Sequence, residues 1–445
     1  MKKLSVVLVV VLISVVAFGA GLVDNGNQSA SFIRTMNRNA STDIDAVYFN
    51  PAGLTKLEDG LYLSFSNQSI FQEKEIKNDY AALNEDTYVG DVKAMFFPDF
   101  YFAYKTGKLA VSGAVMPIGG GGSADYAKGL PSFETGIAGM AASLAPYGVT
   151  GYQTDISFEG SSIYLAGQFN VSYAISDMIS VAVGGRYISA NNTYEGYIKD
   201  IQVNTAAGFM APGDYMRYVA TTLTGVDSLT AVGTASVLDV ATADVEVDAE
   251  QTGTAFNGIF GVHYDLDKLQ IAIRYAMQAK LEVENDTKVD GSGLFPDGAK
   301  SNEDMPAILA TGISYQVSPK MKVETDFNYY FNTSADWDGA EDNVDNGYNV
   351  GIAVELGLSD KLLASVGYIY DAKGVKEVYQ TDMGFTLDNH SIGAGFNYKL
   401  NDKMNIDFGV SNTFYIEDER DFTAYKETYN RTTFDVAVGV SYKLF

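Results

Sequence analysis

Few side chains in this sequence could act as nucleophiles or as metal ligands. The chain has two histidines, His263 and His390, and no cysteine. Two isolated imidazoles are too few for a histidine metal site, and the lack of cysteine excludes thiolate ligands and disulfide bonds. Ser391 follows His390, but no motif joins either histidine to an activated serine. We therefore expect no catalytic residue, no metal site and no cofactor, and we predict that the protein is not an enzyme.

The sequence is strongly acidic, with a formal net charge of −26. Nucleic acids are bound through clustered lysines and arginines, so we expect no nucleic-acid partner. An acidic surface usually serves solubility, although acidic loops can also bridge to other anionic groups through divalent cations. The 44 glycines, 30 tyrosines and 25 phenylalanines favour many short strands with aromatic faces.

Residues 1–19 have the features of a secretory signal peptide. Lys2 and Lys3 precede the apolar run Leu4–Val16, and small residues at 17 and 19 indicate cleavage before Ala20. The alternative is a membrane anchor, but the run is shorter than the roughly 20 residues that span a bilayer. A mature protein without such a helix can cross a membrane only as a closed barrel.

The sequence after residue 60 alternates apolar and polar residues, as strands with one lipid-facing side do. In the last segment Phe434, Val436 and Val438 share one face, and Asp435 and Ala437 the other. Short and long connections alternate along the chain, which is typical of an up-and-down barrel. The expected strands are about 61–71, 93–104, 109–117, 156–174, 179–198, 253–265, 268–283, 306–317, 321–332, 347–358, 362–371, 387–400, 403–416 and 431–444. Tyrosines near the strand ends suggest two aromatic girdles, for example Tyr101, Tyr104, Tyr173, Tyr187, Tyr264, Tyr275, Tyr315, Tyr368, Tyr370 and Tyr398.

The polar segment 20–58 does not read as a wall strand. It carries Arg34 and Arg38 and contains the sharp turn signal Asn50-Pro51-Ala52-Gly53. Fourteen strands enclose a lumen too wide for wall side chains to fill. We predict an all-β fold, a 14-stranded antiparallel transmembrane β-barrel (59–445) with residues 20–58 inside it as a hatch. A disordered periplasmic tail is the alternative.

The sequence resembles the FadL-type outer-membrane transporters of hydrophobic compounds. The resemblance covers the leader, Ala20-Gly21-Leu22, the Asn-Pro-Ala motif within Ala46–Leu54, Phe97–Tyr101 and Met116–Gly119. The resemblance implies capture of a hydrophobic molecule by outer loops, passage through a pocket, hatch movement and lateral release at a kinked third strand. Proline and glycine suit such a kink, at Gly113, Pro117, Gly119 and Gly120; a strand that ends at Pro117 is the alternative.

Two further sets of residues are candidates for ligand contact. Strand parity directs Arg186 and Arg274 inward, where they could contact a carboxylate head group or pair with lumenal acids. Leu130, Phe133, Ile137, Met140 and Leu144 have helical spacing and could form a capture surface or ordinary packing.

We predict a monomeric protein of the outer membrane, in contact with outer-membrane lipid, that transports long-chain fatty acids or other hydrophobic small molecules by passive diffusion. The alternative is a structural or adhesive barrel whose acidic outer loops, chiefly 199–252, carry the function. An open porin would not need a hatch.

Overall fold

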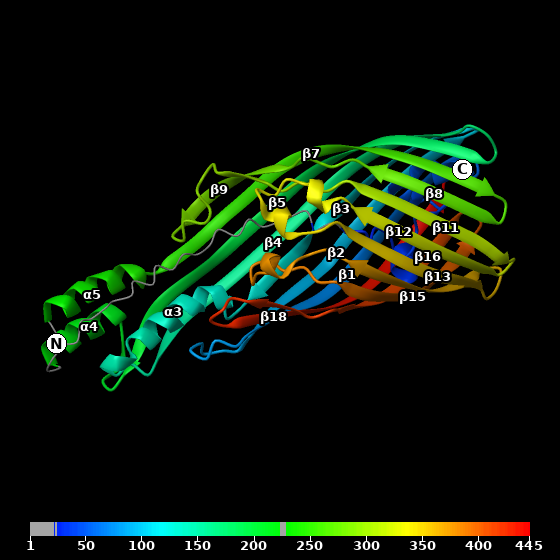
Figure 1. The fold of residues 1–445 in the computed structure, drawn as a ribbon. Helices are drawn as coiled ribbons and strands as arrows, with labels where there is room; N and C mark the ends of the chain where they lie inside the picture. Colours follow the sequence, from blue (N-terminus) through cyan, green and yellow to red (C-terminus); the bar gives the residue numbers. More distant parts are fainter. Residues whose placement is uncertain (1–21, 23–24, 223–227) are drawn as a thin grey trace.

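The computed structural model describes residues 22, 25–222 and 228–445, so the predicted signal peptide lies outside the described residues. The described residues form a closed barrel of fourteen antiparallel strands, as predicted (Figure 1). The ring closes because the first strand pairs with both the second and the last.

The wall strands are β1 (Gly60–Asn78), β2 (Thr87–Thr106), β3 (Leu109–Tyr126), β4 (Gly151–Ala174), β5 (Ile179–Thr205), β7 (Val245–Leu266), β8 (Leu269–Ala276) continued by β9 (Glu282–Asp290), β11 (Ile308–Ser318), β12 (Met321–Tyr330), β13 (Gly347–Gly357), β14 (Leu362–Ala372), β15 (Asn389–Asn401), β16 (Met404–Tyr415) and β18 (Lys426–Lys443). Three short strands, β6 (Gly208–Met210), β10 (Lys300–Asn302) and β17 (Asp418–Asp421), extend the outer loops. The loops also hold the 3₁₀ turns η3 (Ala145–Tyr147), η4 (Asn332–Ser334), η5 (Ala340–Asn343) and η6 (Glu377–Tyr379).

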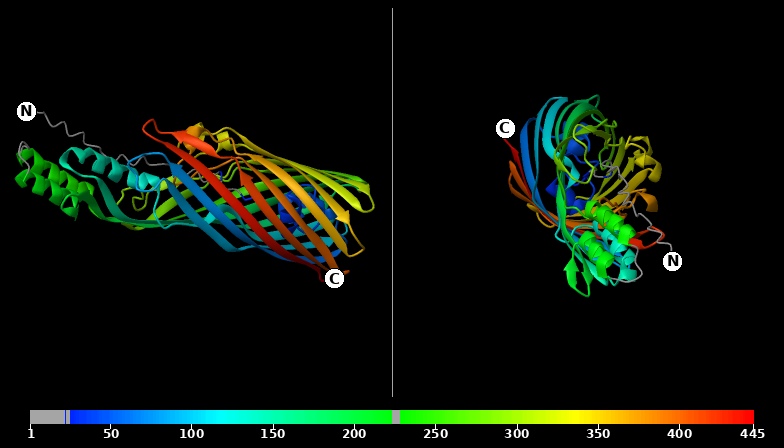
Figure 2. Two further views of the ribbon diagram at one scale, coloured as in Figure 1. Left: turned by 90° about the horizontal axis from the view of Figure 1, so that it is seen from below. Right: turned by 90° about the vertical axis from the view of Figure 1, so that its left-hand side faces the viewer.

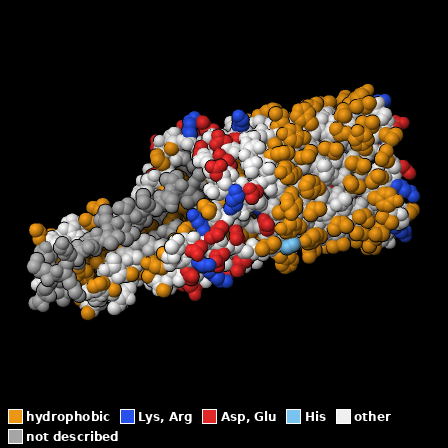
Figure 3. Space-filling model, in the orientation of Figure 1, with side chains coloured by type: hydrophobic (Ala, Val, Ile, Leu, Met, Phe, Trp, Pro, Cys, Tyr) orange, Lys and Arg blue, Asp and Glu red, His pale blue; other side chains and the backbone are white. Residues whose placement is uncertain are grey.

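The outer surface of the barrel is apolar. On β18, Phe434, Val438 and Tyr442 are exposed, whereas Asp435 and Ala437 between them are buried. Hydrophobic side chains gather in a band over the barrel strands, with charged side chains on both sides of it (Figure 3). Such a band is what a lipid-facing surface requires. Among the described residues, no helix combines the length and the apolar character needed to cross a bilayer.

Several strands continue beyond their expected ends. β1 to β5 and β7 extend past the apolar band, and β4, β5 and β7 lead to a projecting arm (Figure 1). The arm carries α3 (Pro131–Ser143), α4 (Pro212–Thr222) and α5 (Ser228–Ala241). Apolar alternation stops where the exposed apolar band ends, but backbone hydrogen bonding does not, so the pattern could not reveal these extensions.

The expected strand 268–283 is wrong as a single element. β8 ends at Ala276 and pairs with β11, whereas β9 begins at Glu282 and pairs with β7 and β10. In the break, Ala279 bridges to Met305, and the Leu281 backbone N–H donates to the Asp304 carboxylate at 2.8 Å. In the sequence, apolar and polar residues keep alternating through the break, although the buried positions change there from even numbers (Ala276) to odd numbers (Ala279), so periodicity could not show the break.

Most of the predicted girdle tyrosines are exposed on the outer surface, but Tyr101 is not. It has no exposed surface, and its hydroxyl donates to the Gln28 carbonyl inside the barrel. The reason is strand parity, because Phe100 takes the outward position beside it.

Residues 25–57, here called the N-terminal segment, lie inside the barrel (Figure 2). The segment contains α1 (Ala30–Thr35), α2 (Ala46–Phe49) and η2 (Pro51–Lys56). α1 contacts β13 to β16 and β18, and η2 contacts β4, β5 and β7, so opposite parts of the wall touch the same short segment.

Candidate functional site

Arg34 of α1 joins the N-terminal segment to the wall. Its guanidinium bonds the Glu355 carboxylate on β13, donates from Nε to Asp407 on β16 at 2.9 Å, and donates to the Ser365 hydroxyl at 3.1 Å. Lys322 of β12 also pairs with Glu355. Arg34 is 3% exposed, and buried carboxylates are stable only with such partners. The segment is therefore held by charge as well as by packing.

Arg38 organises the next part of the segment. It donates from Nε to Asp45 at 2.8 Å and from Nη2 to Asp43 at 2.6 Å. Burial alone would lower the pKa of Arg38, but the carboxylates of Asp45 and Asp43 outweigh it and raise the pKa well above its ordinary value. Asp326 on β12 accepts hydrogen bonds from the backbone N–H groups of Arg38 and Asn39 at 2.6 and 2.8 Å.

Glycines on the inner face of the wall let this segment approach the strands closely. An added Cβ at Gly367 would lie 1.6 Å from the carbonyl oxygen of Thr35, and one at Gly393 would lie 2.2 Å from that of Ile33. Such distances are not possible between real atoms. Added Cβ atoms would also meet the segment at other wall glycines, on β7, β11, β13, β15, β16 and β18: Gly261, Gly312, Gly351, Gly395, Gly409 and Gly439. The strands thus carry a glycine seat for the N-terminal segment.

Gly367→Ala is expected to displace the segment, because its methyl group would overlap backbone atoms that cannot rotate away. Overpacking of this kind costs roughly 1–3 kcal/mol. Trypsin should then cleave the folded barrel faster after Arg34 and Arg38, which are buried in the wild type. Gly167→Ala on β4 is the matched control, since an added Cβ there meets nothing within 4 Å. If trypsin cleaves the two variants after Arg34 and Arg38 at the same rate, the glycine seat does not position the segment.

The predicted turn at Asn50–Gly53 forms the start of η2 and fixes it to the wall. The Asn50 side chain donates to the Val262 carbonyl of β7 at 2.9 Å and caps η2 by accepting from the N–H two residues later at 3.2 Å. The Pro51 carbonyl accepts from the Ser172 hydroxyl of β4 at 2.7 Å. At Gly53 an added Cβ would lie 2.2 Å from a backbone carbonyl oxygen, so the position requires glycine.

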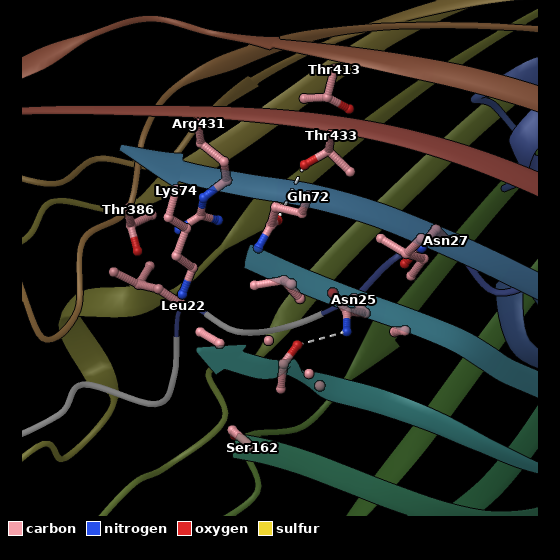
Figure 4. A pocket seen from close by; sticks show the side chains of 18 of the residues that line it. Leu22, Asn25, Asn27, Gln72, Lys74, Ser162, Thr386, Thr413, Arg431 and Thr433 are labelled. Carbon is pink, nitrogen blue, oxygen red and sulfur yellow. Dashed lines mark hydrogen bonds between the residues drawn. The ribbon is translucent and has the colours of Figure 1, made fainter. Parts of the chain in front are cut away.

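A cavity of about 540 Å³ lies between the N-terminal segment and the outer loops (Figure 4). The segment contributes residues 25–27, Phe32, Ile33 and Met36, and the loop after β14 contributes Tyr379 and residues 383–387. Much of the remaining lining is apolar or aromatic and comes from β1 to β5. The volume is within the range of small-molecule binding sites, about 300–1,000 Å³.

The wall beside this cavity is incompletely paired. β2 and β3 pair from Thr106↔Leu109 to Phe100↔Val115 and again at Val92↔Ala124, so residues 93–99 and 116–123 form no ladder with each other. We call this stretch the unpaired interval. β3 also bulges against β4 between residues 117 and 122, and Gly120 and Gly122 have φ of 99° and 71°.

Three of the four predicted kink residues lie in the unpaired interval, and one does not. Pro117, Gly119 and Gly120 lie in the unpaired interval, whereas Gly113 is regularly paired with both neighbouring strands. Because β3 continues to Tyr126, the alternative of a strand that ends at Pro117 is wrong.

The cavity continues through the unpaired interval to the outside of the barrel. Its lining includes residues 119–122 together with Phe96 and Ile163. Phe96 is 84% exposed and Ile163 is 49% exposed, so both belong to the outer surface. The same cavity is therefore lined by inner residues and by residues of the apolar outer surface.

The N-terminal segment lies directly behind this interval and satisfies its free carbonyl groups. The backbone N–H of Asn25 donates to Ile118 at 2.8 Å, and its side chain donates to Gly120 at 3.1 Å (Figure 4). Gln28 donates to the Pro117 carbonyl at 2.7 Å. The segment therefore supplies hydrogen-bond donors to β3 at the place where β2 does not pair with it.

Arg186 and Arg274 point inward, as predicted, but both contact the N-terminal segment. Their guanidinium carbons lie 5.0 and 5.1 Å from the centre of the Tyr48 ring, and Arg274 donates to the Tyr48 carbonyl at 3.1 Å. Arg186 also donates to the Gln168 side chain at 2.8 and 2.9 Å. Neither residue is among those that line the described cavity.

The five residues predicted as a capture surface lie in or beside α3. Ile137 and Leu144 are buried in an apolar core shared with α4 and α5, and Phe133 and Met140 pack against it. Leu130 belongs to a neighbouring apolar cluster between the outer strands. None of the five lines the described cavity: four pack in the core of the arm, and Leu130 packs between the outer strands.

The two histidines lie far apart in the strand order. His263 of β7 is buried, and His390 of β15 bonds through Nδ1 to the Tyr368 hydroxyl at 2.6 Å on the outer surface. In the described part of the chain, no three acidic or histidine side chains are grouped so that they could hold a metal ion.

No family model and no curated protein matches this sequence. Solved structures do match its fold. A FadL homologue of Pseudomonas aeruginosa is 12% identical, with 96% of this chain and 100% of that chain covered and a TM-score of 0.65. The Pseudomonas putida toluene transporter TodX is 13% identical, with 91% and 95% covered and a TM-score of 0.58. The Ralstonia pickettii toluene transporter TbuX is 14% identical, with 91% and 94% covered and a TM-score of 0.56.

These likenesses define the class of fold. The chain has the barrel fold of the FadL-type transporters, which confirms the resemblance read from its motifs at the level of fold. The solved proteins that resemble it in shape include one FadL homologue and two toluene transporters.

Proposed function

We propose that the chain is an outer-membrane transporter that carries hydrophobic molecules, long-chain fatty acids first among them, by passive diffusion. The observation that carries this proposal is the cavity that opens through the unpaired interval onto the apolar outer surface. The fold shared with a FadL homologue and two toluene transporters supports hydrophobic cargo.

We infer that cargo leaves sideways into lipid. Each methylene group transferred from an apolar site into water costs about 0.8 kcal/mol, so release of a long alkyl chain into water is very unfavourable. Release through the unpaired interval avoids that transfer. The N-terminal segment acts as the hatch, since moving Asn25 and Gln28 would free the interval.

The proposal assigns a role to each part of the chain. Residues 1–19 are removed as a signal peptide, residues 20–58 form the hatch, and residues 59–445 form a monomeric barrel in the outer membrane. The arm supports the second candidate, a structural or adhesive barrel, because Leu229 and Val240 on α5 are 82% and 80% exposed. An adhesive barrel would use this arm and would need no open cavity.

Uptake of radiolabelled oleate tests the proposal. Cells that produce the protein should take up oleate several times faster than cells that lack its gene. A variant in which residues 206–244 are replaced by a short turn should keep this uptake, because the cavity lining does not include them. Equal uptake with and without the gene would discard fatty-acid transport and favour the adhesive alternative.

A further inference from the structure

Two polar residues, Asn67 and Ser69, lie on the apolar outer face of β1. Phe65 and Phe71 on either side of them are 54% and 40% exposed, which places this row of β1 on the outer surface. In the ladder with β18, Asn67 is paired with Val438, which is also exposed. Polar groups in an apolar band are costly unless their hydrogen bonds are satisfied, so the two residues need partners there.

The partners belong to a bulge in β2. The β1–β2 ladder shifts by one residue, so that Met95 and Phe96 together lie opposite Ser69. Met95 and Phe96 are consecutive, yet both are exposed, because the extra residue breaks the alternation of β2. The bulge falls within residues 93–99, where β2 forms no ladder with β3.

Asn67 and Ser69 bond the backbone of this bulge. The Met95 carbonyl accepts from the Asn67 side-chain amide and from the Ser69 hydroxyl, both at 3.1 Å. The Phe97 N–H donates to the Asn67 side-chain oxygen at 3.1 Å. A bilayer offers backbone groups no water to bond, so a bulge in the apolar band depends on protein partners of this kind.

We propose that Asn67 and Ser69 are positioning residues for the wall opening: they fix the bulge of β2, and the bulge bends β2 away from β3. This inference rests on the proposed transport function and names residues on which its exit route depends. A bulge bends the strand that contains it. Without the two side chains, the bulge is expected to move toward the outer end of β2, where water can bond the backbone, and β2 is expected to straighten across the unpaired interval.

Cysteine crosslinking reports the position of the bulge, because the chain has no cysteine of its own. Ile70 is paired with Ala94 in this structure, and both line the cavity. If the bulge moves outward, Ile70 pairs with Met95 instead. Oxidation should therefore crosslink Ile70→Cys/Ala94→Cys in the wild-type background and not Ile70→Cys/Met95→Cys. With Asn67→Leu/Ser69→Ala added, crosslinking of the first pair should fall roughly fivefold or more and that of the second should rise, because a shift of one residue turns each side chain to the other face.

Oleate uptake at equal amounts of folded barrel measures the consequence for transport. Asn67→Leu/Ser69→Ala should take up oleate roughly fivefold or more slowly than the wild type, since a straightened β2 narrows the exit. Ser69→Thr keeps the hydroxyl and should match the wild type in both measurements. Thr311→Val is the matched control, because the Thr311 hydroxyl also donates to a carbonyl of the neighbouring strand, that of Phe327 at 3.2 Å, but across the regular part of the β11–β12 ladder. It should change neither crosslinking nor uptake.

A wild-type crosslinking pattern in the double variant would overturn the inference, because the two residues would then not fix the bulge. A shifted pattern with uptake at the wild-type rate would also overturn it, because the bulge would then not hold the exit open. If the double variant does not fold, Ser69→Ala alone should give a smaller change of the same kind. Absence of oleate uptake by the wild type would instead contradict the proposed function, and the crosslinking pattern would still decide whether Asn67 and Ser69 fix the bulge.

Discussion

Gly121→Trp is expected to lower oleate uptake at least tenfold while the barrel still folds. Gly121 lines the cavity at the unpaired interval, and an added Cβ there meets nothing within 4 Å. A large side chain can therefore enter open space without straining the wall. A tenfold slower rate corresponds to a barrier about 1.4 kcal/mol higher, a modest demand on an indole ring that fills the opening.

Gly151→Trp is the control for this prediction. Gly151 begins β4 on the arm, an added Cβ there also meets nothing within 4 Å, and the residue does not line the described cavity. Initial rates of oleate uptake should be measured for both variants at equal amounts of folded protein in the membrane. If Gly121→Trp transports at the rate of Gly151→Trp, cargo does not pass through the interval.

Arg34→Met is expected to have the largest effect on the stability of the N-terminal segment. The change leaves the buried Glu355 and Asp407 without their shared partner, and breaking a buried ion pair in this way costs about 3–5 kcal/mol. We expect the segment to leave its seat before the barrel unfolds. Trypsin should then cleave after Arg38 much faster, while the strands stay protected.

Arg217→Met provides the comparison. Arg217 on α4 also pairs with two carboxylates, Asp214 and Asp239, but its side chain is 45% exposed. Solvent screens such an exposed ion pair, so Arg217→Met should be cleaved by trypsin at nearly the wild-type rate. Arg34→Lys keeps the positive charge, so its N-terminal segment should be cleaved by trypsin more slowly than that of Arg34→Met. If all three variants are protected alike, the segment is held by packing and not by Arg34.

The wall of the barrel could be predicted from the sequence because lipid dictates its pattern. Each strand of a barrel in a membrane must present an apolar residue to the outside at every second position. On β18, Phe434 is exposed on the outer surface, whereas the next residue, Asp435, is buried. The extensions toward the arm and the break between β8 and β9 could not be predicted in this way. The extensions are set by backbone pairing outside the band, which leaves no such pattern in the side chains. The break was hidden for the opposite reason, because apolar and polar residues keep alternating through it.

The candidate site was only partly predictable. Strand parity placed Arg186 and Arg274 on the inner face of the wall. Parity does not say which residue inside the barrel their side chains contact, and both contact the Tyr48 ring. Lys74 and Arg431, which line the cavity, become neighbours only because the first and last strands close the ring. The glycine seat had a signal in the sequence, namely glycines recurring at inward positions of consecutive strands, such as Gly409 and Gly439.

We expect an apolar molecule to cross this barrel by entering the cavity and leaving through its side wall. A structure of the purified protein with bound oleate tests this route most directly. We expect elongated density inside the barrel, with one end directed at residues 119–122. Oleate found only on the outer apolar band, with ordered water filling the cavity, would contradict it.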